Sequence, residues 1–270
     1  MLLSAIVASA LCPPALASGA DLPIIAAAIR AGRLIQAEVM LARLPAPADA
    51  VEAEAVDAIR GQFALATGAS AQALQIFGRL REVAPARCDY LRDFGVAAAR
   101  LGDARALEAL RDTAPRCATW QSSQMLGVVL ARGQGWAESE SAFAQSLSLS
   151  PDNPVTLNNR AFARIEQGRY ADARDDLGKA LRAAPGDRRI AGNIDLVEGA
   201  MGNAPRRRGG VDDDRRWASR LTLASKGALR AGRRDLARAL LAEAIQIDPQ
   251  FTPEANRLLD GLKDARGEAR

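Results

Sequence analysis

The pattern of apolar and polar positions repeats along the chain at a fixed spacing. In four stretches, two segments with apolar residues at helical spacing flank one marker residue. A small residue lies seven positions before each marker and another five after it, a large apolar residue lies nine after it, and a proline lies seventeen after it. This pattern predicts two antiparallel helices per stretch. The markers are Gly68, Gln134, Gly168 and Gly232, and the prolines are Pro85, Pro151, Pro185 and Pro249.

Each position in the pattern has a physical reason. The small residues are expected where the two helices cross closely, and the marker is expected in the left-handed turn that ends the first helix. The large apolar residue fills the space toward the next pair, and the proline ends the second helix. A single pair cannot bury its own apolar face, so several must stack. The sequence therefore predicts an all-α chain of stacked helix hairpins.

The clearest copy of the pattern runs from Pro154 to Pro185 and resembles the tetratricopeptide repeat (TPR) family. It departs from that family at Arg160 and Arg164, where leucine and tyrosine are usual. The resemblance implies an all-α superhelical solenoid of antiparallel helix hairpins. The matching residues are Asn159, Ala161, Gly168, Tyr170, Ala173, Leu177, Ala180 and Pro185.

The repeats also predict how the chain is divided. Between residues 204 and 216, a proline, paired glycines and clustered charges predict a mobile, solvated linker. Its three consecutive arginines, 206–208, are alternatively an anionic-ligand patch or a protease-sensitive site. We expect an array over 18–203, with units at 18–45, 54–85, 88–115, 120–151 and 154–185 and a lone helix at 188–203, and a last hairpin with a capping helix at 217–265.

The first 17 residues are expected to be a cleaved signal peptide. An uncharged apolar run is followed by small residues at Ala15 and Ala17, as at a secretory cleavage site. The run is too short to cross a bilayer, so no stable membrane span is expected. This interpretation predicts a periplasmic protein. The alternatives are a buried N-terminal helix of a cytosolic protein and a lipoprotein anchored at Cys12, although Leu11 departs from the lipobox.

Cysteine usage is consistent with export. Without Cys12 the chain keeps Cys88 and Cys117, an even number that suits one disulfide in an oxidising compartment. Both follow a proline closely and so occupy similar places in successive units. The alternative is two reduced thiols in a helical core.

Composition argues against several classes of function. The chain has no histidine, which excludes Ser-His-Asp triads, Cys-His dyads and histidine-ligated metals. No phosphate-binding loop or nucleophile elbow is present, so we expect no enzyme and no cofactor. A net charge of +4 without a basic stripe interleaved with aromatic residues predicts no nucleic-acid partner.

The resemblance to TPR proteins also implies a concave groove, lined by the first helices, that binds polypeptides. The matched positions do not reproduce the lysine-asparagine clamp with which chaperone-binding members hold carboxylates. The candidate groove residues are Asp89, Arg92, Val96, Arg100, Gln121, Gln124, Val128, Arg132, Asn158, Phe162, Glu166, Thr222, Lys226 and Arg230.

A narrower resemblance concerns the end of the chain. The lone helix with Asn193 and Gly202, followed by the segment that Trp217 opens, is similar to the TPR components of bacterial Flp/Tad pilus assembly. It implies a non-catalytic periplasmic scaffold for protein or peptide partners of the cell envelope, in pilus or secretion-system assembly. The alternatives are an envelope regulator that tethers a cell-wall enzyme and a cytosolic TPR adaptor.

Overall fold

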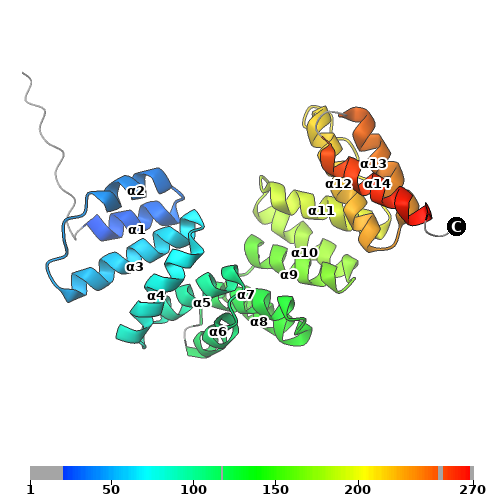
Figure 1. The fold of residues 1–270 in the computed structure, drawn as a ribbon. Coiled ribbons are helices and arrows are strands. Elements are labelled where there is room, and N and C mark those ends of the chain that lie inside the picture. The colour runs from blue at the N-terminus through cyan, green and yellow to red at the C-terminus, as the bar shows by residue number, and fades with distance from the viewer. Residues whose placement is uncertain (1–20, 117, 249–251, 268–270) are drawn as a thin grey trace, which may run out of the picture. The chain divides into compact units, whose positions relative to one another are not determined.

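The computed structural model describes residues 21–116, 118–248 and 252–267, and every regular element in these ranges is an α-helix (Figure 1). The expected signal peptide, 1–17, lies outside them. The chain forms two compact units that divide after residue 117. This division falls between the expected repeats 88–115 and 120–151 rather than at the expected linker. None of the described helices is long and apolar enough to cross a membrane.

The first unit consists of successive antiparallel helices, each packed against the next. Its clearest hairpin joins α3 and α4, whose buried face includes Phe77 and continues onto Tyr90 and Phe94 of α5. The ring centroids of Phe77 and Tyr90 lie 6.3 Å apart. The helices are α1 (Leu22–Arg30), α2 (Leu34–Ala42), α3 (Ala50–Thr67), α4 (Ser70–Val83), α5 (Cys88–Leu101) and α6 (Arg105–Arg116).

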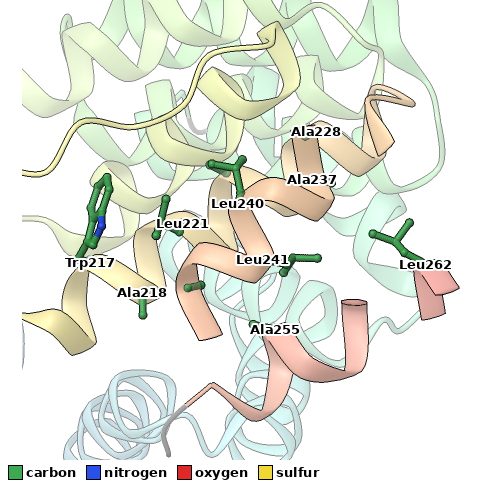
Figure 2. Close-up of a cluster of buried hydrophobic side chains, with 11 residues drawn as sticks. Trp217, Ala218, Leu221, Ala228, Ala237, Leu240, Leu241, Ala255 and Leu262 are labelled. Atoms are coloured by element: carbon green, nitrogen blue, oxygen red, sulfur yellow. The ribbon is translucent and has the colours of Figure 1, made fainter. Parts of the chain in front are cut away.

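The second unit continues the same architecture. Helices α7 and α8, α9 and α10, and α12 and α13 form hairpins, and α14 packs on α13. Figure 2 shows the last core, a cluster of buried side chains that includes Trp217 and Leu221 of α12, Leu240 and Leu241 of α13 and Ala255 of α14. The helices are α7 (Trp120–Arg132), α8 (Trp136–Leu149), α9 (Pro154–Glu166), α10 (Tyr170–Ala183), α11 (Arg188–Met201), α12 (Asp214–Arg230), α13 (Arg234–Ile247) and α14 (Pro253–Gly267).

The turns inside the hairpins have the conformation that the marker residues predict. Gly68 has φ +86° and caps α3 in the left-handed region, which costs glycine little because it has no Cβ. Gln134 occupies the equivalent position with φ +60°, a conformation that is uncommon for a residue with a side chain. The predicted left-handed turn is therefore confirmed even where glycine is missing.

Small and large residues meet inside the hairpins. A Cβ on Gly61 of α3 would lie 2.7 Å from the ring of Phe77 in α4, and one on Gly127 of α7 would lie 2.8 Å from the ring of Phe143 in α8. Both rings are fully buried. The glycine of the first helix thus makes room for the aromatic side chain of the second, which explains the spacing seen in the sequence.

Helix α11 has no second helix before α12, and these two helices pack directly on each other. A Cβ on Gly199 would lie 1.9 Å from the carbonyl oxygen of Ala224, and one on Gly227 would lie 1.7 Å from that of Leu196. No side chain fits at such distances, so glycine allows the two backbones to touch.

The segment between α11 and α12 is anchored by a buried carboxylate. The expected linker, 204–216, is largely exposed, but the Asp212 side chain within it is fully buried. Its Oδ2 accepts hydrogen bonds from the backbone of Arg208 at 2.8 Å and from Nη1 of Arg220 at 2.6 Å. Arg220 also binds Asp195 of α11, so one guanidinium joins the segment to both helices. The segment is therefore fastened to the packed helices, and α12 already begins at Asp214.

Candidate functional site

A pocket of about 470 Å³ lies between α7 and α9, the first helices of two successive hairpins in the second unit. Phe162 is 47% exposed and borders this pocket, although large aromatic side chains are usually buried. The lining residues are Val128, Ala131, Arg132, Gln134, Trp136, Asn159, Phe162, Ala163 and Glu166.

Helix geometry explains why these side chains converge. Val128 and Arg132 are four residues apart on α7, as are Phe162 and Glu166 on α9, so each pair shares one face of its helix. Because α7 and α9 pack together, the two faces border one hollow. The structure thus brings together four residues that the sequence had placed in a groove. It shows where they lie, and their binding role stays a prediction.

The sequence did not predict five further residues of the pocket, Ala131, Gln134, Trp136, Asn159 and Ala163. Gln134 lies in the turn between α7 and α8, Trp136 begins α8, and Asn159 lies on α9. The groove prediction considered selected positions on the first helices alone, so it omitted the turns and the residues that begin the second helices. Trp136 is large and lies directly after the turn that follows Arg132, so considering the turn would have added it.

The pocket has an ion pair on its α9 side. Glu166 pairs with Arg230 of α12, which lies 64 residues later in the sequence. Arg230 was predicted as a groove residue, and in the structure its guanidinium binds the carboxylate of Glu166. The apolar wall from Val128 and Phe162 is thus edged by charged groups of both signs.

Several other predicted groove residues bind partners within the chain. Asn158 accepts a hydrogen bond of 2.8 Å from Asn193 of α11. Lys226 forms a 2.6 Å ion pair with Glu254 of α14. Gln124 is only 5% exposed and Gln121 is half-buried. Gln124 is thus buried rather than exposed on α7, and its role as a groove residue stays a prediction.

The predicted groove residues of the first unit are likewise engaged. The Asp89 carboxylate binds the Arg87 guanidinium at 2.7 and 3.0 Å. Burial opposes ionisation of Asp89, but this hydrogen bond and the arginine charge outweigh it, so its pKa lies below the usual value. Arg92 binds Asp93 at 2.7 Å, and Arg100 donates to the Leu65 carbonyl at 2.5 Å.

Helix α9 is held by a buried ion network on the side opposite Phe162. Arg160 and Arg164, the two departures from the repeat pattern, both bind the carboxylate of Asp176 in α10, which is 2% exposed. Arg164 also binds Glu140 of α8 at 2.8 and 2.9 Å. Residues two positions apart lie about 200° apart around a helix, so this clamp directs Phe162 outward. The network therefore positions the pocket wall.

The described residues offer no metal site, since no cluster of three or more carboxylate or thiolate groups lies among them. Cys88 at the start of α5 is disulfide-bonded. Cys117, its expected partner, lies outside the described residues, so the pairing stays a prediction.

No protein-family model and no curated protein matches the sequence of the chain, whereas its fold is similar to several solved structures. One is a chain of the APC/C hetero-tetramer Cut9–Hcn1, with a TM-score of 0.62 and 15% identity, over 88% of this chain and 48% of that one. This chain thus spans about half the length of that relative.

Two other solved structures match over nearly their whole length. PilW, a widely conserved type IV pilus biogenesis factor, has a TM-score of 0.57 and 16% identity, over 89% of this chain and 97% of that one. A tetratricopeptide repeat protein from Parabacteroides merdae has a TM-score of 0.54 and 15% identity, over 91% and 98%. The expected fold class is confirmed: the chain has the tetratricopeptide-repeat fold.

Proposed function

We propose that the chain is a non-catalytic scaffold that binds a polypeptide in the pocket between α7 and α9. The observation that carries this proposal is the exposed Phe162 ring beside Val128, edged by Arg132 and Glu166. An apolar wall binds side chains of a partner, and flanking charges select its orientation. Pockets of about 300–1,000 Å³ typically bury a drug-sized group, so this pocket has room for side chains of a peptide rather than for a folded surface.

We further propose that the partner belongs to a pilus or secretion machine of the cell envelope and that the chain is exported to the periplasm. The fold similarity to PilW supports this assignment, because that protein is a pilus biogenesis factor of similar length. The apolar run and small residues before residue 18 support export. Cell fractionation with N-terminal sequencing of the mature chain tests export, and a cytosolic chain that keeps Met1 contradicts it.

The pocket is tested by photo-crosslinking in cells. A benzoylphenylalanine at position 162 is expected to form an adduct with one polypeptide, identified by mass spectrometry. The matched control is the same photo-crosslinker at Val155, which also lies on α9 and is similarly exposed, at 44%, but does not border the pocket. A pilin or secretion component captured at 162 and not at 155 supports the proposal.

Other outcomes contradict specific parts of it. Equal adducts at both positions contradict specific binding in the pocket. A cell-wall enzyme captured at 162 supports binding in the pocket but contradicts the assignment of the partner to a pilus. Arg132→Ala is expected to weaken the specific adduct, while the thermal unfolding midpoint changes little because Arg132 is exposed.

A further inference from the structure

A second pocket, of about 520 Å³, lies where the repeat array lacks a helix. It is formed by the start of α11, the segment before α12, and α12 itself. Five arginines and three aspartates line it, so charged groups dominate a hollow that also has apolar walls. The role of these charges depends on which of them are already neutralised within the chain.

The aspartates of this pocket form hydrogen bonds to other residues of the chain. Asp195 accepts two hydrogen bonds, of 2.8 and 2.9 Å, from the Arg220 guanidinium. Asp213 caps α12 by accepting from the backbone N–H of Arg216 at 2.7 Å. Asp187 caps α11 in the same way and binds the side chain of Arg189. These carboxylates stabilise the walls.

Part of the positive charge has no such partner. Arg188 is exposed and forms no ion pair or hydrogen bond through its side chain within the described part of the chain. Arg216 donates to the carbonyl oxygen of Val211, which carries no charge. Arg208 lies 3.6 Å from Asp212, a carboxylate that it shares with Arg220. Arg188 and Arg216 therefore line the pocket with guanidinium charges that no described carboxylate pairs with.

We propose that this pocket binds an acidic segment of a partner polypeptide through carboxylates. Guanidinium groups bind carboxylates with two parallel hydrogen bonds. The apolar walls from Ala191, Val211 and Leu223 suit the aliphatic residues that neighbour those carboxylates. This site is separate from the pocket at Phe162 and does not depend on the function proposed for it.

The composition of the pocket favours carboxylates over phosphates. The three aspartates in its wall offset part of the arginine charge, so the pocket attracts a densely charged phosphate chain less strongly than an arginine cluster alone would. Among its described lining residues none is aromatic, so nucleic-acid bases would find no stacking surface. The moderate net charge of the chain agrees with this choice.

Fluorescence anisotropy with the purified full-length chain tests the proposal. The probe is a fluorescein-labelled peptide of alternating glutamate and leucine, and the control peptide has glutamine in place of glutamate. We expect only the glutamate peptide to bind, with affinity that falls as salt is raised. The double variant Arg188→Ala/Arg216→Ala is expected to bind it about tenfold more weakly.

Two further variants separate binding from folding. Arg188→Ala alone breaks no described side-chain hydrogen bond or ion pair, and we expect it to weaken binding while the unfolding midpoint is unchanged. Arg182→Ala removes an exposed arginine of α10 outside the pocket and should leave binding unchanged. Equal binding by all variants, or equal affinity for both peptides, contradicts the proposal. Displacement by millimolar inorganic phosphate or by short single-stranded DNA assigns the site to phosphates and also overturns it.

Discussion

Arg160 donates two hydrogen bonds to the carboxylate of Asp176, Nε to Oδ2 at 2.8 Å and Nη2 to Oδ1 at 2.7 Å, and so joins α9 to its hairpin partner α10. Arg160 lies at a position where the TPR family usually has leucine. Arg164 binds the same carboxylate, so two charged residues that look unsuited to a core form one satisfied unit with Asp176.

Removal of that shared carboxylate is expected to destabilise the second unit strongly. Asp176→Ala leaves two guanidinium groups without their buried partner, and breaking a buried ion pair in this way costs about 3–5 kcal/mol. Urea unfolding followed by circular dichroism measures the change. The triple variant Arg160→Leu/Arg164→Tyr/Asp176→Ala restores the apolar pattern and should recover most of the loss. A triple variant as unstable as Asp176→Ala would contradict this account.

Gly199→Ala is expected to disrupt the contact between α11 and α12. Its Cβ would lie 1.9 Å from the Ala224 carbonyl oxygen, which is backbone and cannot rotate away. The helices must then separate, at a cost of about 3 kcal/mol or more. The control is Gly178→Ala in α10, whose Cβ would meet only the end of Arg182 at 3.7 Å. It should raise stability by about 0.5–1 kcal/mol because alanine favours the helix. Equal losses from both changes would argue against the close approach.

The charge network makes stability fall on the acid side. Burial opposes ionisation of Glu140, but the hydrogen bonds and charge of Arg164 and the charge of Arg169 outweigh it, so its pKa lies below 4.5. The contribution of Glu140 to the free energy of unfolding is therefore fully present above about pH 4.5. It is lost as the pH falls through the lower pKa of the folded state.

This pH dependence is measured as the urea midpoint between pH 7 and pH 3. Glu140→Gln should lower the midpoint at pH 7 and flatten the slope below about pH 4.5, since the glutamine does not titrate. Glu138→Gln is the control on the same helix, because Glu138 is exposed. An unchanged acid slope in Glu140→Gln would refute the assignment.

The predicted disulfide has its own test. If Cys88 pairs with Cys117, peptide mapping without reduction yields a linked peptide that contains both residues. Reduction is expected to lower the free energy of unfolding by about 3 kcal/mol, because the bridge closes a long loop in the unfolded chain. Cys88→Ser should have the same effect and abolish the response to reductant. A linked peptide that contains Cys12 would disprove the pairing.

The sequence alone determined the local architecture. The hairpins and their left-handed turns depend on residues a few positions apart, and even Gln134 was identified as a turn because its neighbours keep the spacing of the glycine-containing copies. The positions of Val128, Arg132, Phe162 and Glu166 on the first helices followed from the same spacing.

Only the tertiary structure decided which faces meet. It placed Gln124 inside, linked Glu166 to Arg230, and assigned Arg160 and Arg164 to one buried carboxylate. Each of these outcomes depends on the distance between helices far apart in sequence, and such distances follow from side-chain packing and charge pairing across the whole unit rather than from local propensity.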